Sequence, residues 1–214
     1  MGIQERKKRE REMRRRQIQD AAKELFITKG FGSTTMEDIA QRAELSAATI
    51  YLYFKNKDEL YASLNLIAFQ YLYNKIKKIH DNNRLSVFEK LSKFKDAMYS
   101  TYQYDPLILR NIFHVQLEDT LLNIGHDMLN QLNDLPHKVM TMIGEVFEEG
   151  ITQKIIQKGH RIAYADTIWA IFSGLVLWEE SKKRFDPKKN FLKPTMDMAF
   201  DVFIRGIKKS RNKK

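Results

Sequence analysis

The sequence of 214 residues contains no cysteine and no long uninterrupted apolar run. The absence of cysteine excludes disulfides, thiolate metal ligands and thiol redox chemistry. Because no stretch of 18 apolar residues occurs, we expect no membrane-spanning helix. The charged N-terminal stretch also lacks the apolar core of a secretory signal. Together these absences favour a cytoplasmic protein.

Sequence motifs of enzymes and metal sites are absent as well. There is no GxGxxG, GxxxxGK[ST] or GxSxG motif, and the scattered histidines form no HExxH pair. Acidic pairs such as Glu118–Asp119 and Glu179–Glu180 are adjacent in the chain. Neighbours on a helix point about 100° apart, so these pairs are typical of solvated faces and not of acid/base dyads. We therefore expect no enzymatic activity, no bound metal and no cofactor.

The formal net charge of +10 comes from the two ends of the sequence. Residues 1–16 hold eight basic and three acidic side chains, and residues 208–214 hold five basic and none acidic. Residues 17–60 hold five basic and seven acidic side chains, so this segment is slightly acidic. The overall charge alone therefore does not identify a surface that binds nucleic acid. Residues 1–16 are either a solvated, fraying arm or an arm that contacts phosphates or the minor groove.

Residues 18–60 predict three short helices and the start of a fourth. Apolar residues repeat at helical spacing in the first, and Gly30 follows where a left-handed cap would lie. Thr35 with Asp38, or Thr34 with Glu37, has the spacing of a capping box for the second helix, and Ser46 can cap a third. Asn56 can cap a fourth helix that begins near Lys57. Because only three or four residues join the second and third helices, they must cross steeply, as in a helix-turn-helix.

Ile50 and Phe54 can fill the core beneath this crossing, which leaves the residues around them facing outward. In type and spacing the segment resembles the tetracycline-repressor (TetR) family of bacterial transcription regulators. The residues that carry the resemblance are Ile18, Ala21, Ala22, Leu25, Phe26, Gly30, Phe31, Thr34, Thr35, Met36, Ile39, Ala40, Ala43, Ser46, Thr49, Ile50, Tyr51, Tyr53, Phe54, Lys57 and Leu60. The resemblance covers residues 18–60, and the remainder of the chain matches only in being helical and of suitable length.

The resemblance implies particular roles in DNA binding. Phosphates would be bound by Thr35 and Lys57, each at a helix N-terminus, and by the hydroxyls of Tyr51 and Tyr53. The small and apolar residues of the third helix would face base edges in the major groove. The predicted DNA-binding residues are Arg14, Arg15, Arg16, Thr35, Ser46, Ala47, Ala48, Thr49, Tyr51, Leu52, Tyr53 and Lys57.

The third helix lacks the side chains that read bases most specifically. It has no Arg, Lys, Asn or Gln between Ser46 and Phe54, so bidentate contacts to guanine or adenine are missing. Base discrimination would rest on Thr49, on apolar contacts to thymine methyl groups and on DNA shape. We therefore expect modest sequence discrimination by this helix.

The helical pattern continues to the C-terminus and predicts an all-α fold. Expected helices span residues 60–80, 85–104 and 163–184, and others begin at Pro106, Pro136 and Pro194. The predicted domains are a basic arm at residues 1–16, the helix-turn-helix at 17–60, and a ligand-binding and dimerisation domain at 61–214. A purely structural three-helix module without a DNA role is the alternative for the first domain.

The resemblance also implies an apolar pocket and a dimer interface in the second domain. The candidate ligand-binding residues are Phe69, Tyr73, Tyr99, Tyr102, Phe113, His114, Phe147, Trp169 and Phe172, where His114 or Arg110 could hold a polar end of the ligand. The ordinary interpretation of such aromatic stripes is core packing. The candidate dimer residues are Ile171, Gly174, Leu175, Trp178, Phe200, Phe203, Ile204 and Ile207.

The predicted function is therefore a homodimeric, sequence-specific regulator of transcription. We expect a repressor that a small, largely apolar ligand releases from its DNA operator. The alternatives are an activator of the same fold, a DNA-binding protein without a ligand response, a sequence-independent DNA-packaging protein and an enzyme.

Overall fold

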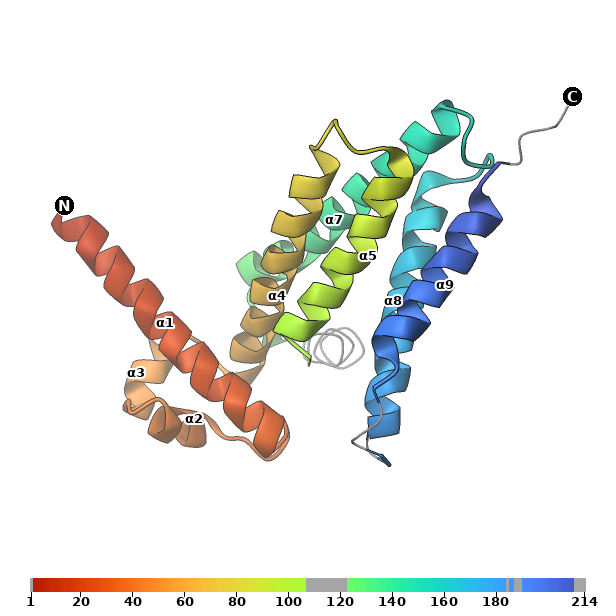
Figure 1. Ribbon diagram of the computed structural model, residues 1–214. Helices are drawn as coiled ribbons and strands as arrows, with labels where there is room; N and C mark the ends of the chain where they lie inside the picture. Colours follow the sequence, from red (N-terminus) through yellow and green to blue (C-terminus); the bar gives the residue numbers. More distant parts are fainter. Residues whose placement is uncertain (1, 107–122, 184, 187–189, 210–214) are drawn as a thin grey trace, which may run out of the picture. The chain divides into compact units, whose positions relative to one another are not determined.

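The computed structural model of the protein describes residues 2–106, 123–183, 185–186 and 190–209, which form helices joined by turns and loops (Figure 1). Between Ile156 and Lys208 there is an isolated antiparallel bridge. The helices are α1 (Ile3–Thr28), α2 (Met36–Arg42), α3 (Ala47–Tyr51), α4 (Lys57–His80), α5 (Val87–Tyr104), α7 (His126–Thr152), α8 (Arg161–Lys183) and α9 (Leu192–Ile207). The all-α prediction is confirmed for this part of the chain.

The described residues divide into two units. The first contains residues 2–67 and 123–132, and the second contains residues 68–106 and 133–209. The predicted helix-turn-helix domain ended at residue 60, whereas the first unit also contains residues 61–67 and 123–132. Ile124 and Met128 are buried in the same apolar cluster as Ile18, Ile50 and Phe54.

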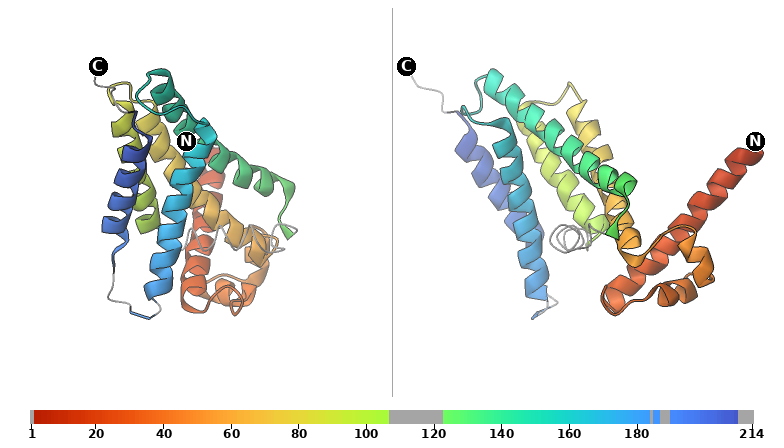
Figure 2. Two further views of the ribbon diagram at one scale, coloured as in Figure 1. Left: turned by 90° about the vertical axis from the view of Figure 1, so that its right-hand side faces the viewer. Right: turned by 180° about the vertical axis from the view of Figure 1, so that it is seen from behind.

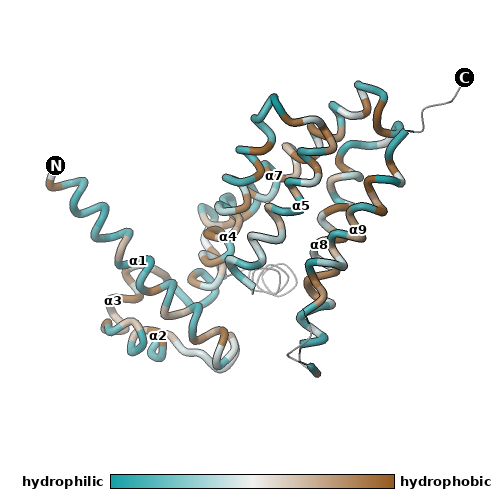
Figure 3. Tube along the Cα trace, viewed as in Figure 1, coloured by the Kyte–Doolittle hydropathy of each residue, from teal (hydrophilic) through white to brown (hydrophobic). Residues whose placement is uncertain are grey.

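Helix α1 continues through the segment that was expected to be a separate arm. It begins at Ile3 and runs without a break to Thr28. Arg, Lys, Glu and Gln are good helix formers, and Arg6 lies 3.5 Å from Glu10 in an i,i+4 ion pair. Figure 3 shows that the first half of α1 is hydrophilic, whereas apolar residues alternate with polar ones in the second half. The basic segment is thus a helical overhang of the first unit.

The second half of α1 holds α2 and α3 in place. Its stripe of Ile18, Ala22 and Phe26 is fully or almost fully buried, and α1 contacts α2, which contacts α3. The chain leaves α1 through Gly30, whose φ of 81° lies in the left-handed region that glycine tolerates best. Both the buried stripe and the glycine cap agree with the sequence prediction.

Pro136 does not begin a helix, contrary to the sequence prediction. It lies inside α7, ten residues after the helix begins at His126. Proline lacks the N–H that would bond to the preceding turn, but residues on both sides of it are held by packing. Met128 is buried on one side, and Val139 and Ile143 are buried on the other.

The second unit is built around α5, α8 and α9. Helices α8 and α9 run side by side in opposite directions, and α5 contacts both (Figure 2). Their facing sides bury Phe94, Phe172, Val176, Met196 and Phe200. No helix among the described residues is long and apolar enough to cross a lipid bilayer.

Candidate nucleic-acid interface

The N-terminus of α2 carries the predicted capping box. The Thr35 hydroxyl accepts a hydrogen bond from the backbone N–H of Asp38 at 3.0 Å, and the Asp38 carboxylate accepts one from the N–H of Thr35 at 3.0 Å. Lys29 also lies 3.0 Å from that carboxylate. The hydrogen bond from the Thr35 backbone and the Lys29 ammonium hold the pKa of Asp38 below its ordinary value. Thr35 is therefore exposed at a helix start that is fixed by its neighbours.

Helix α3 is only five residues long, and hydroxyl groups fix its beginning. The Ser46 hydroxyl accepts a hydrogen bond from the Thr49 N–H at 3.1 Å and lies 2.8 Å from the Thr49 hydroxyl. Sequence analysis predicted Ser46 as the cap and Thr49 as a base reader. The two hydroxyls share one hydrogen bond, so they form a single polar group at the start of the helix.

The side chains of α3 and of the turn after it separate sharply into buried and exposed sets. Ile50 and Phe54 are 0% and 1% exposed, and they anchor the helix to the core. Tyr51 and Leu52 are 49% and 76% exposed. An exposed leucine beside an exposed tyrosine leaves a substantial apolar surface open to a partner.

The other predicted residues of α3 lie between these extremes. Ala48 is exposed, whereas Ala47 and Tyr53 are partly buried and pack against the core. Ala47 therefore has less surface to offer to a base edge than its neighbour Ala48. Helix α3 ends at Tyr51, so Leu52 and Tyr53 lie in the following turn and not in the helix itself.

Lys57 begins α4, as predicted, but its ammonium already has partners in the chain. It donates to the backbone oxygens of Phe31 and Thr34, each at 2.8 Å, and lies 4.4 Å from the centroid of the Phe31 ring. An ammonium has three N–H donors, so two of them are used here. Lys57 therefore fixes the loop between α1 and α2, a role that sequence analysis did not identify.

The three arginines of the basic segment have different surroundings. Arg14 is exposed and donates to the Gln17 side chain at 2.9 Å. Arg15 is partly buried and donates to the backbone oxygen of Tyr53 at 3.3 Å, with its guanidinium 4.2 Å from the Phe54 ring centroid. Burial lowers the pKa of Arg15 from its ordinary value, and the charge of Glu59 acts in the opposite direction.

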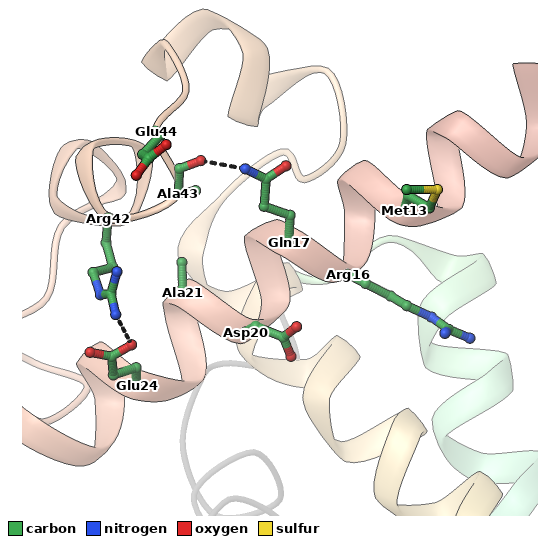
Figure 4. Close-up of a pocket in the computed structure, with 9 residues that line it drawn as sticks. All are labelled: Met13, Arg16, Gln17, Asp20, Ala21, Glu24, Arg42, Ala43 and Glu44. Carbon is green, nitrogen blue, oxygen red and sulfur yellow. Dashed lines mark hydrogen bonds and ion pairs between the residues drawn. The ribbon is translucent and has the colours of Figure 1, made fainter.

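Arg16 lies on a different side of α1, at a groove between α1 and α2 (Figure 4). The groove has a volume of about 550 Å³ and is lined partly by Asp20, Glu24, Arg42 and Glu44. In Figure 4, Gln17 bonds to the backbone of Ala43 across one end, and Arg42 pairs with Glu24. Three carboxylates against two guanidinium groups make this groove a poor surface for a phosphate backbone.

Sequence analysis missed one buried polar contact that holds α1 against α4. Gln19 is 6% exposed, and its amide donates to the Ser63 hydroxyl at 2.9 Å, which in turn donates to the Leu60 oxygen at 2.7 Å. The sequence carried a signal for this contact, because the polar Gln19 directly follows Ile18 beside the apolar stripe of the first helix. A buried amide in such a stripe needs a partner.

Comparisons with known proteins agree with this geometry. Residues 18–64 match the family model described as bacterial regulatory proteins, tetR family. Residues 18–64 therefore carry the DNA-binding segment of the tetR family. YvkB of Bacillus subtilis, named as an HTH-type transcriptional regulator, is 26% identical over 163 residues, which cover 74% of this chain and 79% of YvkB. IcaR of Staphylococcus aureus, named as a negative transcriptional regulator of a biofilm operon, is 26% identical over 137 residues, or 62% of this chain and 68% of IcaR.

Solved structures of tetR-family regulators share the fold. PfmR of Thermus thermophilus matches with a TM-score of 0.71 at 18% identity, covering 88% of this chain and 97% of PfmR. MbdR of Azoarcus matches with a TM-score of 0.70 at 21% identity, covering 90% of this chain and 97% of MbdR. These structures show the fold, while the tetR-family segment and the curated relatives indicate a transcriptional regulator.

Among the described residues, the rings predicted to bind a ligand belong to more than one aromatic cluster. Phe69, Trp169 and Phe172 form one cluster, with ring centroids 6.4 and 5.7 Å apart. Phe147 instead packs against Tyr164 and Phe203, at 5.2 and 6.2 Å.

Two tyrosines of the predicted set lie among charged groups. The Tyr102 hydroxyl donates to Glu180 and accepts from the Lys183 ammonium at 2.6 Å. Burial first, and then the hydrogen bond with Glu180, raise the pKa of Tyr102 above its ordinary value. The ring of Tyr99 lies 5.6 Å from the Lys193 ammonium.

The rest of the predicted ligand set is less informative. Tyr73 is half-buried on α4. Phe113, His114 and Arg110 lie outside the described residues. Among the described residues, no group of three or more His, Asp or Glu side chains is arranged to hold a metal ion.

The predicted dimer residues also divide into two groups. Gly174 and Trp178 are exposed on α8, and Ile171, Leu175, Phe203 and Ile204 are partly buried. Phe200 and Ile207 are buried within the single chain, so the prediction that they face a partner is corrected. Along α9 the inward face repeats at Met196, Phe200 and Ile207, which turns Met198 and Val202 outward. These two side chains are 64% and 60% exposed, and the predicted dimer set did not include them.

Proposed function

We propose that this regulator is a homodimeric repressor whose α3 lies in the major groove of operator DNA. The observation that carries the proposal is the separation of side chains on α3. Ile50 and Phe54 hold the helix to the core, while Ala48, Tyr51 and Leu52 face solvent. The Thr35 and Ser46 hydroxyls cap the starts of α2 and α3. A helix of this kind fits the recognition position of a helix-turn-helix.

Phosphate contacts would come from groups around α3. The hydroxyls of Thr35, Tyr51 and Tyr53 can reach the DNA backbone, and so can the exposed Arg14 of α1. Lys57 has one N–H left for a phosphate after its two bonds to backbone oxygens. We propose that Lys57 acts mainly by shaping the loop that presents Thr35.

Base discrimination would be modest and would favour thymine. The exposed Leu52 and Ala48 can contact thymine methyl groups, and the Ser46–Thr49 hydroxyl pair can donate to a base edge or accept from one. DNA shape and the spacing of the two half-sites would supply the rest.

Negative regulation is proposed from a relative. IcaR, which shares 26% identity with this chain, is named as a negative regulator. An activator of the same fold is the second candidate, because the sign of regulation depends on where the operator lies relative to the promoter.

A small, largely apolar effector is proposed to release the DNA. The cluster of Phe69, Trp169 and Phe172 offers the aromatic surface for it. An effector that binds better to the DNA-free arrangement shifts the population away from the operator complex. A regulator without a ligand response is the alternative, and identification of co-purifying compounds by mass spectrometry, followed by their addition to the operator complex, distinguishes the two.

Selection of bound duplexes from a randomised pool is the deciding experiment. The expected result is a short motif repeated with two-fold symmetry, bound at least a hundredfold more tightly than random DNA at matched salt. Thr49→Ala should weaken that preference several-fold, whereas Thr49→Ser, which keeps the hydroxyl, should retain most of it. Equal affinity for selected and random duplexes would contradict the proposal and favour a packaging protein.

A further inference from the structure

Arg15 is set apart from the other basic residues of α1 by where its guanidinium lies. It occupies the N-terminal end of the buried stripe, three residues before Ile18 and four before Gln19, so the helix turns it toward the core. Its neighbours Arg14 and Arg16 are exposed, whereas Arg15 is partly buried. A guanidinium held against the protein has less freedom to follow a DNA backbone.

The partners of Arg15 belong to the turn that ends the recognition helix. The guanidinium donates to the Tyr53 oxygen at 3.3 Å and covers the Phe54 ring at 4.2 Å. Arginine suits both contacts at once, because its planar fork can stack on an aromatic ring while it donates sideways. Lysine in the same position could keep the charge but not the planar stacking.

Helix α3 needs such support because five residues do not form a stable helix alone. Its beginning is held by Ser46, and its middle by the buried Ile50. At its end, Tyr53 and Phe54 donate to the Ile50 oxygen at 2.9 and 3.0 Å. The backbone oxygen of Tyr53, in the turn after α3, accepts a hydrogen bond from Arg15, which lies 38 residues earlier in the sequence.

We propose that Arg15 is a positioning residue for DNA recognition, which fixes the turn carrying Leu52 and Tyr53 and does not itself contact phosphate. This rests on the proposed function, in which α3 enters the major groove. A displaced turn weakens contacts to the selected sequence more than contacts to random DNA. A lost phosphate contact weakens both equally and lowers the salt dependence.

The test compares Arg15→Lys and Arg15→Gln with Arg14→Gln, which removes the same charge from the same turn of α1. Affinity is measured from 50 to 300 mM salt for a duplex selected by the wild-type protein and for a random duplex. Arg15→Lys is expected to lower the preference for the selected duplex about tenfold, with an unchanged slope of log affinity against log salt. Arg14→Gln should keep the preference within about twofold.

A second measurement needs no DNA. Hydrogen exchange in the free full-length protein should quicken at the Tyr53 and Phe54 amides in both Arg15 variants and stay at the wild-type rate in Arg14→Gln. These amides bond to the Ile50 oxygen in the turn that Arg15 covers. Thermal unfolding of each variant shows that the comparison is made on folded protein.

Two outcomes would overturn the proposal. If Arg15→Lys keeps the wild-type preference, and Arg15→Gln only lowers the salt slope by about 0.9, Arg15 is a phosphate contact. If exchange quickens but the preference is unchanged, Arg15 serves stability alone. A wild-type protein that prefers no duplex breaks the proposed function, and the exchange rates then still decide whether Arg15 fixes the turn.

Discussion

The first unit exposes several of its predicted functional residues next to one another in sequence, whereas the described rings of the predicted set in the second unit belong to separate aromatic clusters. Tyr51 and Leu52 are exposed together beside the Ser46–Thr49 hydroxyl pair. In contrast, Phe147 and Trp169 belong to different aromatic clusters. The difference teaches that a short contiguous motif specifies a surface through local periodicity, while a pocket between distant helices depends on packing that periodicity does not encode.

The largest expected effect is on stability, and it distinguishes residues that hold α3 to the core from residues that face solvent. Ile50→Ala should lower the free energy of unfolding by about 2–5 kcal/mol, because it leaves a cavity in the core of the first unit. Leu52→Ala should change it by less than about 0.5 kcal/mol, because Leu52 is exposed. Urea unfolding measures both.

Leu52 is expected to matter for DNA instead. Leu52→Ala should weaken binding to the selected duplex several-fold, and replacing thymine by deoxyuracil in that duplex should weaken the wild-type protein but not the variant. Deoxyuracil lacks only the methyl group, so this exchange isolates the apolar contact. Equal losses in both proteins would remove Leu52 from the proposed interface.

Lys57 sharpens the comparison between loop support and DNA contact. Lys57→Met should cost about 2–4 kcal/mol of stability, because the backbone oxygens of Phe31 and Thr34 lose a charged donor. Lys55→Met, at an exposed position two residues away, is the matched control and should cost less than about 0.5 kcal/mol. Urea unfolding of the two variants checks this, and equal stabilities would contradict the structural role.

The exposed apolar residues of α8 and α9 allow the second unit to be tested in the same way. We propose that the exposed Trp178 and Val202 lie in the dimer interface, so Trp178→Glu and Val202→Glu should each bury a charge there and raise the dimer dissociation constant about a hundredfold. Ile27→Glu, an exposed apolar position in the first unit, should leave it unchanged. Sedimentation of the three variants measures the effect, and three identical dimers would place the interface elsewhere.

The smallest expected effect is the loss of stability at low pH that comes from protonation of Asp38. Because the pKa of Asp38 is lowered in the folded protein, its contribution to stability is present above the unfolded value of about 4 and is lost as the pH falls through the folded value. The difference in free energy of unfolding between Asp38→Asn and the wild-type protein should therefore shrink as the pH falls below about 4. Glu37→Gln controls for the loss of a carboxylate in the same turn. Urea unfolding between pH 3 and 7 tests this, and a constant gap would contradict it.

Much of the first unit could be predicted because its signals are local. Gly30, Thr35 and Ser46 mark helix ends by their own chemistry, and the apolar stripes mark the buried faces. The roles of Arg15 and Lys57 could not be predicted, because their partners lie 38 and at least 23 residues away in sequence. A charged side chain in a basic run carries no mark of which carbonyl it will meet.

The second unit was less predictable for a related reason. Helix periodicity identified α8 and α9, but not which of their apolar residues turn inward against α5. Phe200 and Val202 lie two residues apart and are both apolar, yet one is buried and the other is exposed. Pro136 shows the same limit, because packing on either side of it outweighs the local tendency of proline to end a helix.

The unbroken start of α1 at Ile3 restricts how the basic segment can meet a duplex. A helix with its side chains is about 10–12 Å across, and the minor groove of B-form DNA is about 6 Å wide. While it stays coiled, this segment is too wide for the minor groove, so it can meet a duplex only along the sugar–phosphate chains or in the major groove, which is about 12 Å wide. Entry into the minor groove would require the first turns of α1 to unwind and exchange their internal hydrogen bonds for contacts with base edges.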